Sequence, residues 1–194
     1  AEKKNSAPVS ISHSTLTGTS SVTNVFSLTG TTFEMCQCTV NGRLHFPGAV
    51  DSGSTIALDF VTLTSPTVGF DKSVGLDGRL EVSNSQITAG TIGFAFDADI
   101  AGTIAIATTD VTAAADAIAF TAGLSGTLSV NGGAALCSGC TFKYDAALSP
   151  VATVAAVVGT AGLADGNVDT PQLVESKYVS ASYSADGARV VKTA

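Results

Sequence analysis

Apolar and polar residues alternate along most of the chain, and glycine marks this alternation at a fixed interval. A ruler of 12 residues meets glycine at seven of its ten marks between residues 18 and 126. The glycine marks are Gly18, Gly30, Gly42, Gly78, Gly90, Gly102 and Gly126, and the others are Ser54, Pro66 and Ala114. A fixed interval of this kind is typical of a repeat fold, in which each unit is one small structural element.

The apolar residues keep the same phase as the glycines. The position four places after each mark is apolar in every unit except the one with Glu34. These residues are Val22, Phe46, Leu58, Phe70, Val82, Phe94, Ile106, Ile118 and Val130. Positions two before and two after the marks are also mostly apolar, which gives a period of two. This period predicts strands of about seven residues with one buried face, joined by short turns.

The glycine of each unit falls on the predicted inward face. Because glycine has no side chain, it would let another backbone or a large side chain approach the sheet closely. We therefore interpret the glycines as packing points of a repeated strand and not as a ligand-binding motif.

Two architectures are compatible with the ruler. The phase persists from Gly18 to Phe142 without a net insertion, which favours a solenoid of stacked coils. A coil of 12 residues would be too narrow for rows of Leu and Phe, so a coil of two units or an antiparallel sheet pair fits better. The prediction is an all-β, two-sheet architecture of short strands repeating every 12 residues. It is a β-sandwich or meander or a β-solenoid, and the strand direction remains open.

Three regions are expected along the chain. Residues 1–15 form an N-terminal arm, residues 16–148 form the repeat-built β domain, and residues 149–194 form a C-terminal extension. A break at Ser149-Pro150 begins this extension. Within it, alternating residues around a turn at Ala185-Asp186-Gly187 predict a hairpin over Lys177–Lys192.

The charge content is low, with 13% charged residues against roughly 25% in an average protein. The net charge is −7, and Lys3-Lys4 is the only basic cluster, so nucleic acid is not expected as a partner. The longest apolar run, Val151–Val158, is too short to span a membrane. Because the chain starts at Ala1, either an initiator methionine was removed or a leader was cleaved.

Four cysteines are the only candidate site residues. Cys36, Cys38, Cys137 and Cys140 are predicted to form structural disulfides within or between chains. Zinc binding by the four thiolates and free buried thiols remain as alternatives. No catalytic or cofactor motif is found, so neither an enzymatic activity nor a cofactor is expected. His45, between two apolar residues, is interpreted as a solvated side chain on the polar face.

The Gly-Thr-Ile and Gly-Thr-Leu sequences at Gly90, Gly102 and Gly126 resemble repeats in secreted adhesins and in virion accessory proteins. The whole chain is similar in style to small β-rich phage virion structural and decoration proteins. This resemblance implies a non-enzymatic subunit of a virion, a capsid decoration or cement protein or a tail accessory protein. Its partners would be copies of itself and other structural proteins of the assembly.

Two other functions remain open at this point. One is an extracellular filament or surface-layer subunit, at the cell surface, that adds a strand to its neighbour. The other is a carbohydrate-binding or adhesive β domain.

Overall fold

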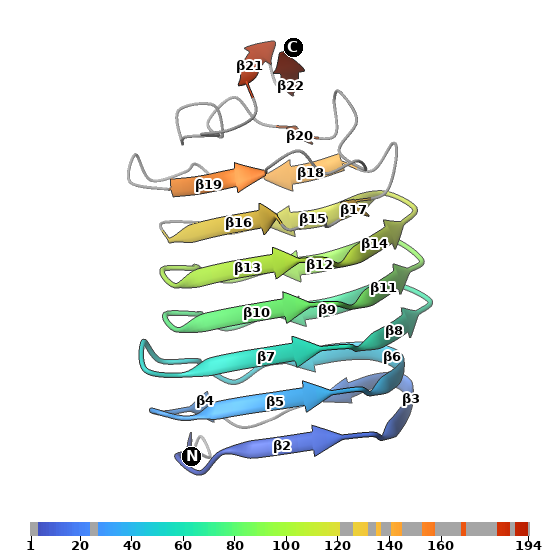
Figure 1. Cartoon of the computed structure of the whole chain (residues 1–194), viewed down its shortest axis with the longest axis vertical. Coiled ribbons are helices and arrows are strands. Elements are labelled where there is room, and N and C mark those ends of the chain that lie inside the picture. The colour runs from blue at the N-terminus through green and yellow to red at the C-terminus, as the bar shows by residue number, and fades with distance from the viewer. Residues whose placement is uncertain are drawn as a thin grey trace.

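The chain forms a vertical stack of short strands (Figure 1). The computed structural model describes residues 4–23, 27–120, 126–131, 135–136, 141–144, 153–157, 168–169, 182–186 and 189–193. These residues form strands, turns and loops and contain no helix. Strand β2 lies at the lower end of the stack, and each later coil lies above the one before it (Figure 1).

One side of the stack is a sheet of seven strands, all parallel to their neighbours. In spatial order they are β2 (Val9–Ser12), β5 (Thr32–Cys36), β7 (Thr55–Asp59), β10 (Arg79–Ser83), β13 (Thr103–Ala107), β16 (Thr127–Asn131) and β19 (Thr153–Val157). Successive strands come from successive coils, so the chain returns to this sheet once per coil.

A second sheet of thirteen strands forms the rest of the coil wall. One column of it holds β8 (Thr62–Ser65), β11 (Gln86–Ala89), β14 (Asp110–Ala113) and β17 (Ala135–Leu136). The other holds β9 (Val68–Lys72), β12 (Ile92–Phe96), β15 (Asp116–Phe120), β18 (Thr141–Tyr144) and β20 (Val168–Asp169). The long strands β3 (Thr15–Thr23) and β6 (Thr39–Phe46) run through both columns. A separate small sheet pairs β1 (Lys4–Asn5) with β4 (Ser27–Leu28).

One coil takes two of the 12-residue units. Thr55 pairs with Arg79, and Arg79 pairs with Thr103, so the strand partner lies two marks further along the chain. The marks divide between two corners of the coil. Gly78 and Gly102 directly precede strands of the seven-stranded sheet, whereas Gly90 lies between the two columns of the second sheet. The expectation of two units per coil is confirmed.

The stacked parallel strands make this protein a β-solenoid. The sandwich and meander alternatives do not describe this stack, because all its coil-to-coil pairings are parallel. The predicted strand length is wrong. From β7 onward the described coil strands have at most five residues, because the chain turns at the glycine marks instead of running through them.

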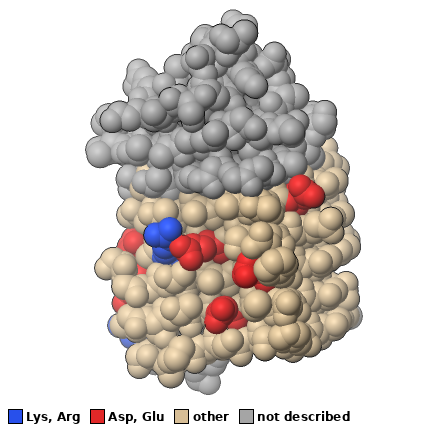
Figure 2. All heavy atoms as spheres, viewed as in Figure 1, with Lys and Arg blue, Asp and Glu red and all other residues tan. Residues whose placement is uncertain are grey.

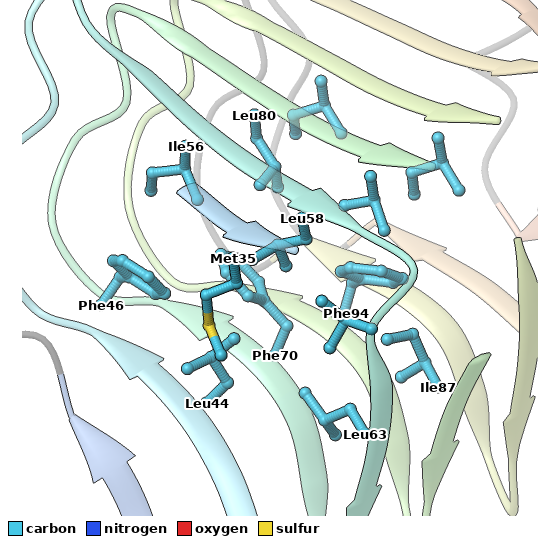
Figure 3. Close-up of a cluster of buried hydrophobic side chains, with 14 of the residues drawn as sticks. Met35, Leu44, Phe46, Ile56, Leu58, Leu63, Phe70, Leu80, Ile87 and Phe94 are labelled. Atoms are coloured by element: carbon cyan, nitrogen blue, oxygen red, sulfur yellow. The ribbon is translucent and has the colours of Figure 1, made fainter. Parts of the chain in front are cut away.

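The inward side chains of the coils form one continuous hydrophobic core. From the seven-stranded sheet, Ile56 and Leu58 are at most 1% exposed, and Phe70 and Phe94 from the second sheet are fully buried. Figure 3 shows these residues converging between the walls of the coil. Phe46, Phe70 and Phe94 form a ladder with ring centroids 5.4 and 5.8 Å apart. The apolar positions that the ruler predicts are thus core positions.

Glycine at the corners permits successive coils to approach each other closely. A Cβ atom added at Gly102 would lie 1.9 Å from the carbonyl oxygen of Gly78 in the coil below. At Gly90, it would lie 1.9 Å from the carbonyl oxygen of Pro66. No side chain fits at such distances, so the expected close backbone approach is confirmed, although it occurs at the corners.

The remaining corner uses left-handed backbone at residues other than glycine. It joins each strand of the seven-stranded sheet to the next strand, and its residue has φ near +50° in five successive coils. These residues are His13, Gln37, Phe60, Asn84 and Thr108. The first four each donate their backbone N–H to the carbonyl of the equivalent strand end in the next coil, at 3.0–3.2 Å. The coil-to-coil hydrogen bonds therefore hold a backbone conformation that costs about 1 kcal/mol per residue.

Gln37→Gly is expected to raise the free energy of unfolding by roughly 0.5 kcal/mol, because glycine adopts the left-handed corner without strain. Gln37 is exposed, so no buried contact is lost. The matched control is Gln86→Gly at an exposed position of β11, where glycine weakens an ordinary strand and should lower stability by roughly 0.5–1 kcal/mol. Urea unfolding of both variants measures this difference. Two shifts of the same sign would contradict the argument.

The stack begins within the residues expected to form an N-terminal arm. Strand β2 pairs with β5 over Val9–Phe33 to Ser12–Cys36, so it is the first strand of the seven-stranded sheet. At the other end of the chain, β21 (Ser182–Asp186) and β22 (Arg189–Thr193) are antiparallel, with Asp186 opposite Arg189. The predicted hairpin is therefore confirmed for the strands that the structure describes.

Candidate assembly surface

The first coil leaves part of the apolar interior open at the N-terminal end of the stack. The side chains of Val9, Ile11, Leu16 and Val22 pack on the core but are only partly buried. One coil further along, Met35 is fully buried. The four side chains border an apolar hollow of about 220 Å³. They lack the covering coil that buries their counterparts elsewhere.

The strands of this coil also have an unpaired side. Among the described strands, β2 pairs only with β5, and β3 pairs only with β6. Backbone N–H and C=O groups along an unpaired strand edge are a template for another strand. The open apolar side chains and the two strand edges lie at the same end of the molecule, and we call this surface the open end.

The open end also lacks charged side chains. No Asp, Glu, Lys or Arg occurs from Asn5 to Phe33, a segment that includes both edge strands. Natural proteins usually protect a free edge with charges, lysine above all. On the face shown in Figure 2, charged side chains are sparse throughout. The charge-free segment is a sequence signal that would have located this surface, and the 12-residue ruler does not contain it.

Two of the four candidate cysteines lie next to the open end. Cys36 ends β5, and Cys38 lies in the corner just before β6. Both are free thiols, so they are not joined to each other. The buried Cys38 Sγ donates a hydrogen bond to the carbonyl of Ile11 in the first coil, at 3.4 Å. Cys38 thus connects the first coil to the second.

Cys36 is not activated for oxidation. Burial raises the pKa of its thiol, and the charges of Asp59 and Glu34 raise it further. At neutral pH the residue is therefore a thiol, whereas the thiolate is the form that reacts. The other two candidates, Cys137 and Cys140, lie outside the described residues, and their pairing remains a prediction.

A buried carboxylate on the second sheet holds two basic side chains. Asp71 in β9 is fully buried and accepts hydrogen bonds from both Nε and Nη2 of Arg43 in β6. Its Oδ2 atom also lies 2.6 Å from Nδ1 of His45. The hydrogen bonds with Asp71 raise the pKa of Arg43 above its usual range. His45 is not the solvated residue expected from the sequence, because its side chain is only 22% exposed.

One lysine lies inside the core. Lys72 takes the inward position between Phe46 and Phe96 in the strand register and is fully buried. Its ammonium group donates hydrogen bonds to the carbonyl oxygens of Gly48 and Val74. Since a buried charge needs such partners, Lys72 fastens the loops after β6 and β9 to the coil wall. The sequence analysis did not single out this residue.

The described residues contain no group of three His, Cys, Asp or Glu side chains arranged to hold a metal ion. They also include no helix that could cross a membrane. No protein-family model matches the chain, and no curated protein or solved structure matches it. The fold and the open end together define the class of this protein, a β-solenoid with an uncharged, uncovered N-terminal end.

Proposed function

We propose that this chain is a non-enzymatic structural subunit of a larger assembly and that it docks through the open end. The observation that carries the proposal is the combination found there. Partly exposed core side chains, two unpaired strand edges and a charge-free segment lie on one surface. Docking would bury the apolar side chains and pair the edges, which are the two terms that stabilise strand addition.

The primary partner in this proposal is a second copy of the chain. Two copies that meet through the same open end form a closed, symmetric pair, the commonest arrangement in homo-oligomers. The low charge content of the whole chain supports a role in assembly. We place this assembly in a virion, as a decoration, cement or tail accessory protein. An extracellular filament or surface layer is the alternative, and a leader encoded upstream of Ala1 would favour it.

Ile11→Lys is expected to abolish self-association while the chain stays folded. In the free subunit, the lysine can extend from the open end into water, whereas in the docked state its charge would be buried. Thr88→Lys is the control, because it adds the same charge at an exposed position in the middle of the stack. Sedimentation velocity should show a dimer or larger species for the wild type and Thr88→Lys, and a monomer for Ile11→Lys.

Circular dichroism checks that both variants keep the β-sheet signal. A wild-type chain that remains monomeric at high concentration would contradict the proposal. So would an Ile11→Lys variant that associates as strongly as the wild type.

A further inference from the structure

A second surface feature lies far from the open end, at the left-handed corner of the middle coils. An open groove of about 430 Å³ runs there across three coils. Phe60 borders it, together with the corner residues Asn84 and Thr108 of the next two coils. The first residues of β8, β11 and β14 form its other side. None of these residues belongs to the open end.

Phe60 is the unusual residue of this groove. Its side chain is 54% exposed, whereas Phe33, the next most exposed phenylalanine in the described part of the chain, is 6% exposed. Its φ of +51° is a conformation that aromatic residues rarely adopt. In the other four described coils this corner holds His, Gln, Asn or Thr. Packing therefore does not explain the phenylalanine, and strained, exposed residues of this kind concentrate at binding sites.

Polar groups lie in a regular row beside the ring. Thr62, Gln86 and Asp110 are exposed and pair in register across three strands, about 4.8 Å apart. The row therefore presents a hydroxyl, an amide and a carboxylate in succession, which supply both donors and acceptors.

The corner beside the ring is held in place. The Asn84 amide donates to Asp59 Oδ1 at 2.9 Å, and the same oxygen accepts from Ser83 Oγ at 2.7 Å. The backbone N–H of Phe60 donates to the Ser83 carbonyl. The groove is thus built on hydrogen-bonded strands and corners, so it needs little reordering to bind a ligand.

We propose that this groove binds a neutral oligosaccharide. The exposed ring of Phe60 offers an apolar face for the C–H face of a sugar, and the row beside it offers partners for the sugar hydroxyls. The groove is lined by Asp110 and by no Lys or Arg, so an anionic glycan or a nucleic acid would find no cation there. This inference does not depend on the proposed assembly function.

The test uses the full-length chain on an array of uncharged hexose oligosaccharides, followed by titration calorimetry with the best binder. Phe60→Asn removes the ring and places at the corner a residue that accepts positive φ. The variant is expected to unfold no more easily than the wild type and to bind at least roughly tenfold more weakly. Val74→Ala is the control, because Val74 is the other exposed large hydrophobic residue and lies outside the groove. It should bind like the wild type.

Three results would overturn the proposal. The wild type binds no uncharged oligosaccharide at millimolar concentration, or Phe60→Asn binds as tightly as the wild type. The third is a protein partner that the wild type binds and Phe60→Asn does not, in the absence of any oligosaccharide binding. Sedimentation of Phe60→Asn should match the wild type, which separates this site from the open end.

Discussion

Gly102→Ala is expected to be among the most destabilising single-methyl additions in this chain, with a loss of about 3 kcal/mol in the free energy of unfolding. The added Cβ would lie 1.9 Å from the carbonyl oxygen of Gly78, and the next nearest atoms belong to the backbone of Asp77. A backbone cannot move aside as a flexible side chain can. The two coils must therefore separate locally, which weakens the hydrogen bonds between β10 and β13.

Gly75→Ala is the matched control for this prediction. Its Cβ would meet only the carbonyl oxygen of Asp99, at an ordinary contact distance of 3.6 Å, and its φ is not positive. The substitution should therefore be neutral or stabilise slightly, because alanine restricts the unfolded chain. Urea unfolding midpoints at constant slope measure both effects. Similar midpoints for the two variants would show that coil spacing is not set by the corner glycines.

Asp71→Asn is expected to lower the free energy of unfolding by about 2 kcal/mol. Asn keeps the shape of the side chain but removes the charge that Arg43 and His45 contact. Removing one partner of a buried ion pair often costs more than this. Here the loss is reduced because Arg43 is 35% exposed and can still reach water.

Glu81→Gln supplies the comparison for the buried pair. Arg79 and Glu81 also form an ion pair, but their side chains are 53% and 43% exposed. Exposed pairs contribute roughly 0–1 kcal/mol, so this variant should stay within about 0.5 kcal/mol of the wild type. Both variants change one carboxylate to its amide, and thermal unfolding can compare them directly. Equal losses for Asp71→Asn and Glu81→Gln would show that burial of Asp71 does not matter.

The hydrophobic positions could be predicted from sequence because they depend only on local alternation. A period of two places Phe70 and Phe94 on one face of a strand whatever the strands pair with. The same period fits parallel and antiparallel neighbours equally well. Strand direction and the number of units per coil therefore followed only from the three-dimensional pairing of residues such as Thr55 and Arg79.

The cluster around Asp71 could not be predicted, because it depends on a local irregularity of the stack. Two marks after His45, the ruler reaches Gly69, whereas the strand register pairs His45 with Asp71. An earlier coil is shorter, so that Thr23 pairs with His45. These two deviations compensate each other, and the ruler stays in phase over the whole repeat. A compensated shift leaves no trace in the periodicity, although it decides which side chains meet.

The sequence by itself determined the strand class, the 12-residue unit and the buried face, since these follow from short-range sterics and hydrophobicity. Only the tertiary structure decided that two units close one coil and that the glycines mark its corners. It also decided that the first coil is left uncovered and that Phe60 lies exposed beside a polar row. These features depend on which coil lies above or below a residue, and that neighbour is twice the repeat interval away along the chain.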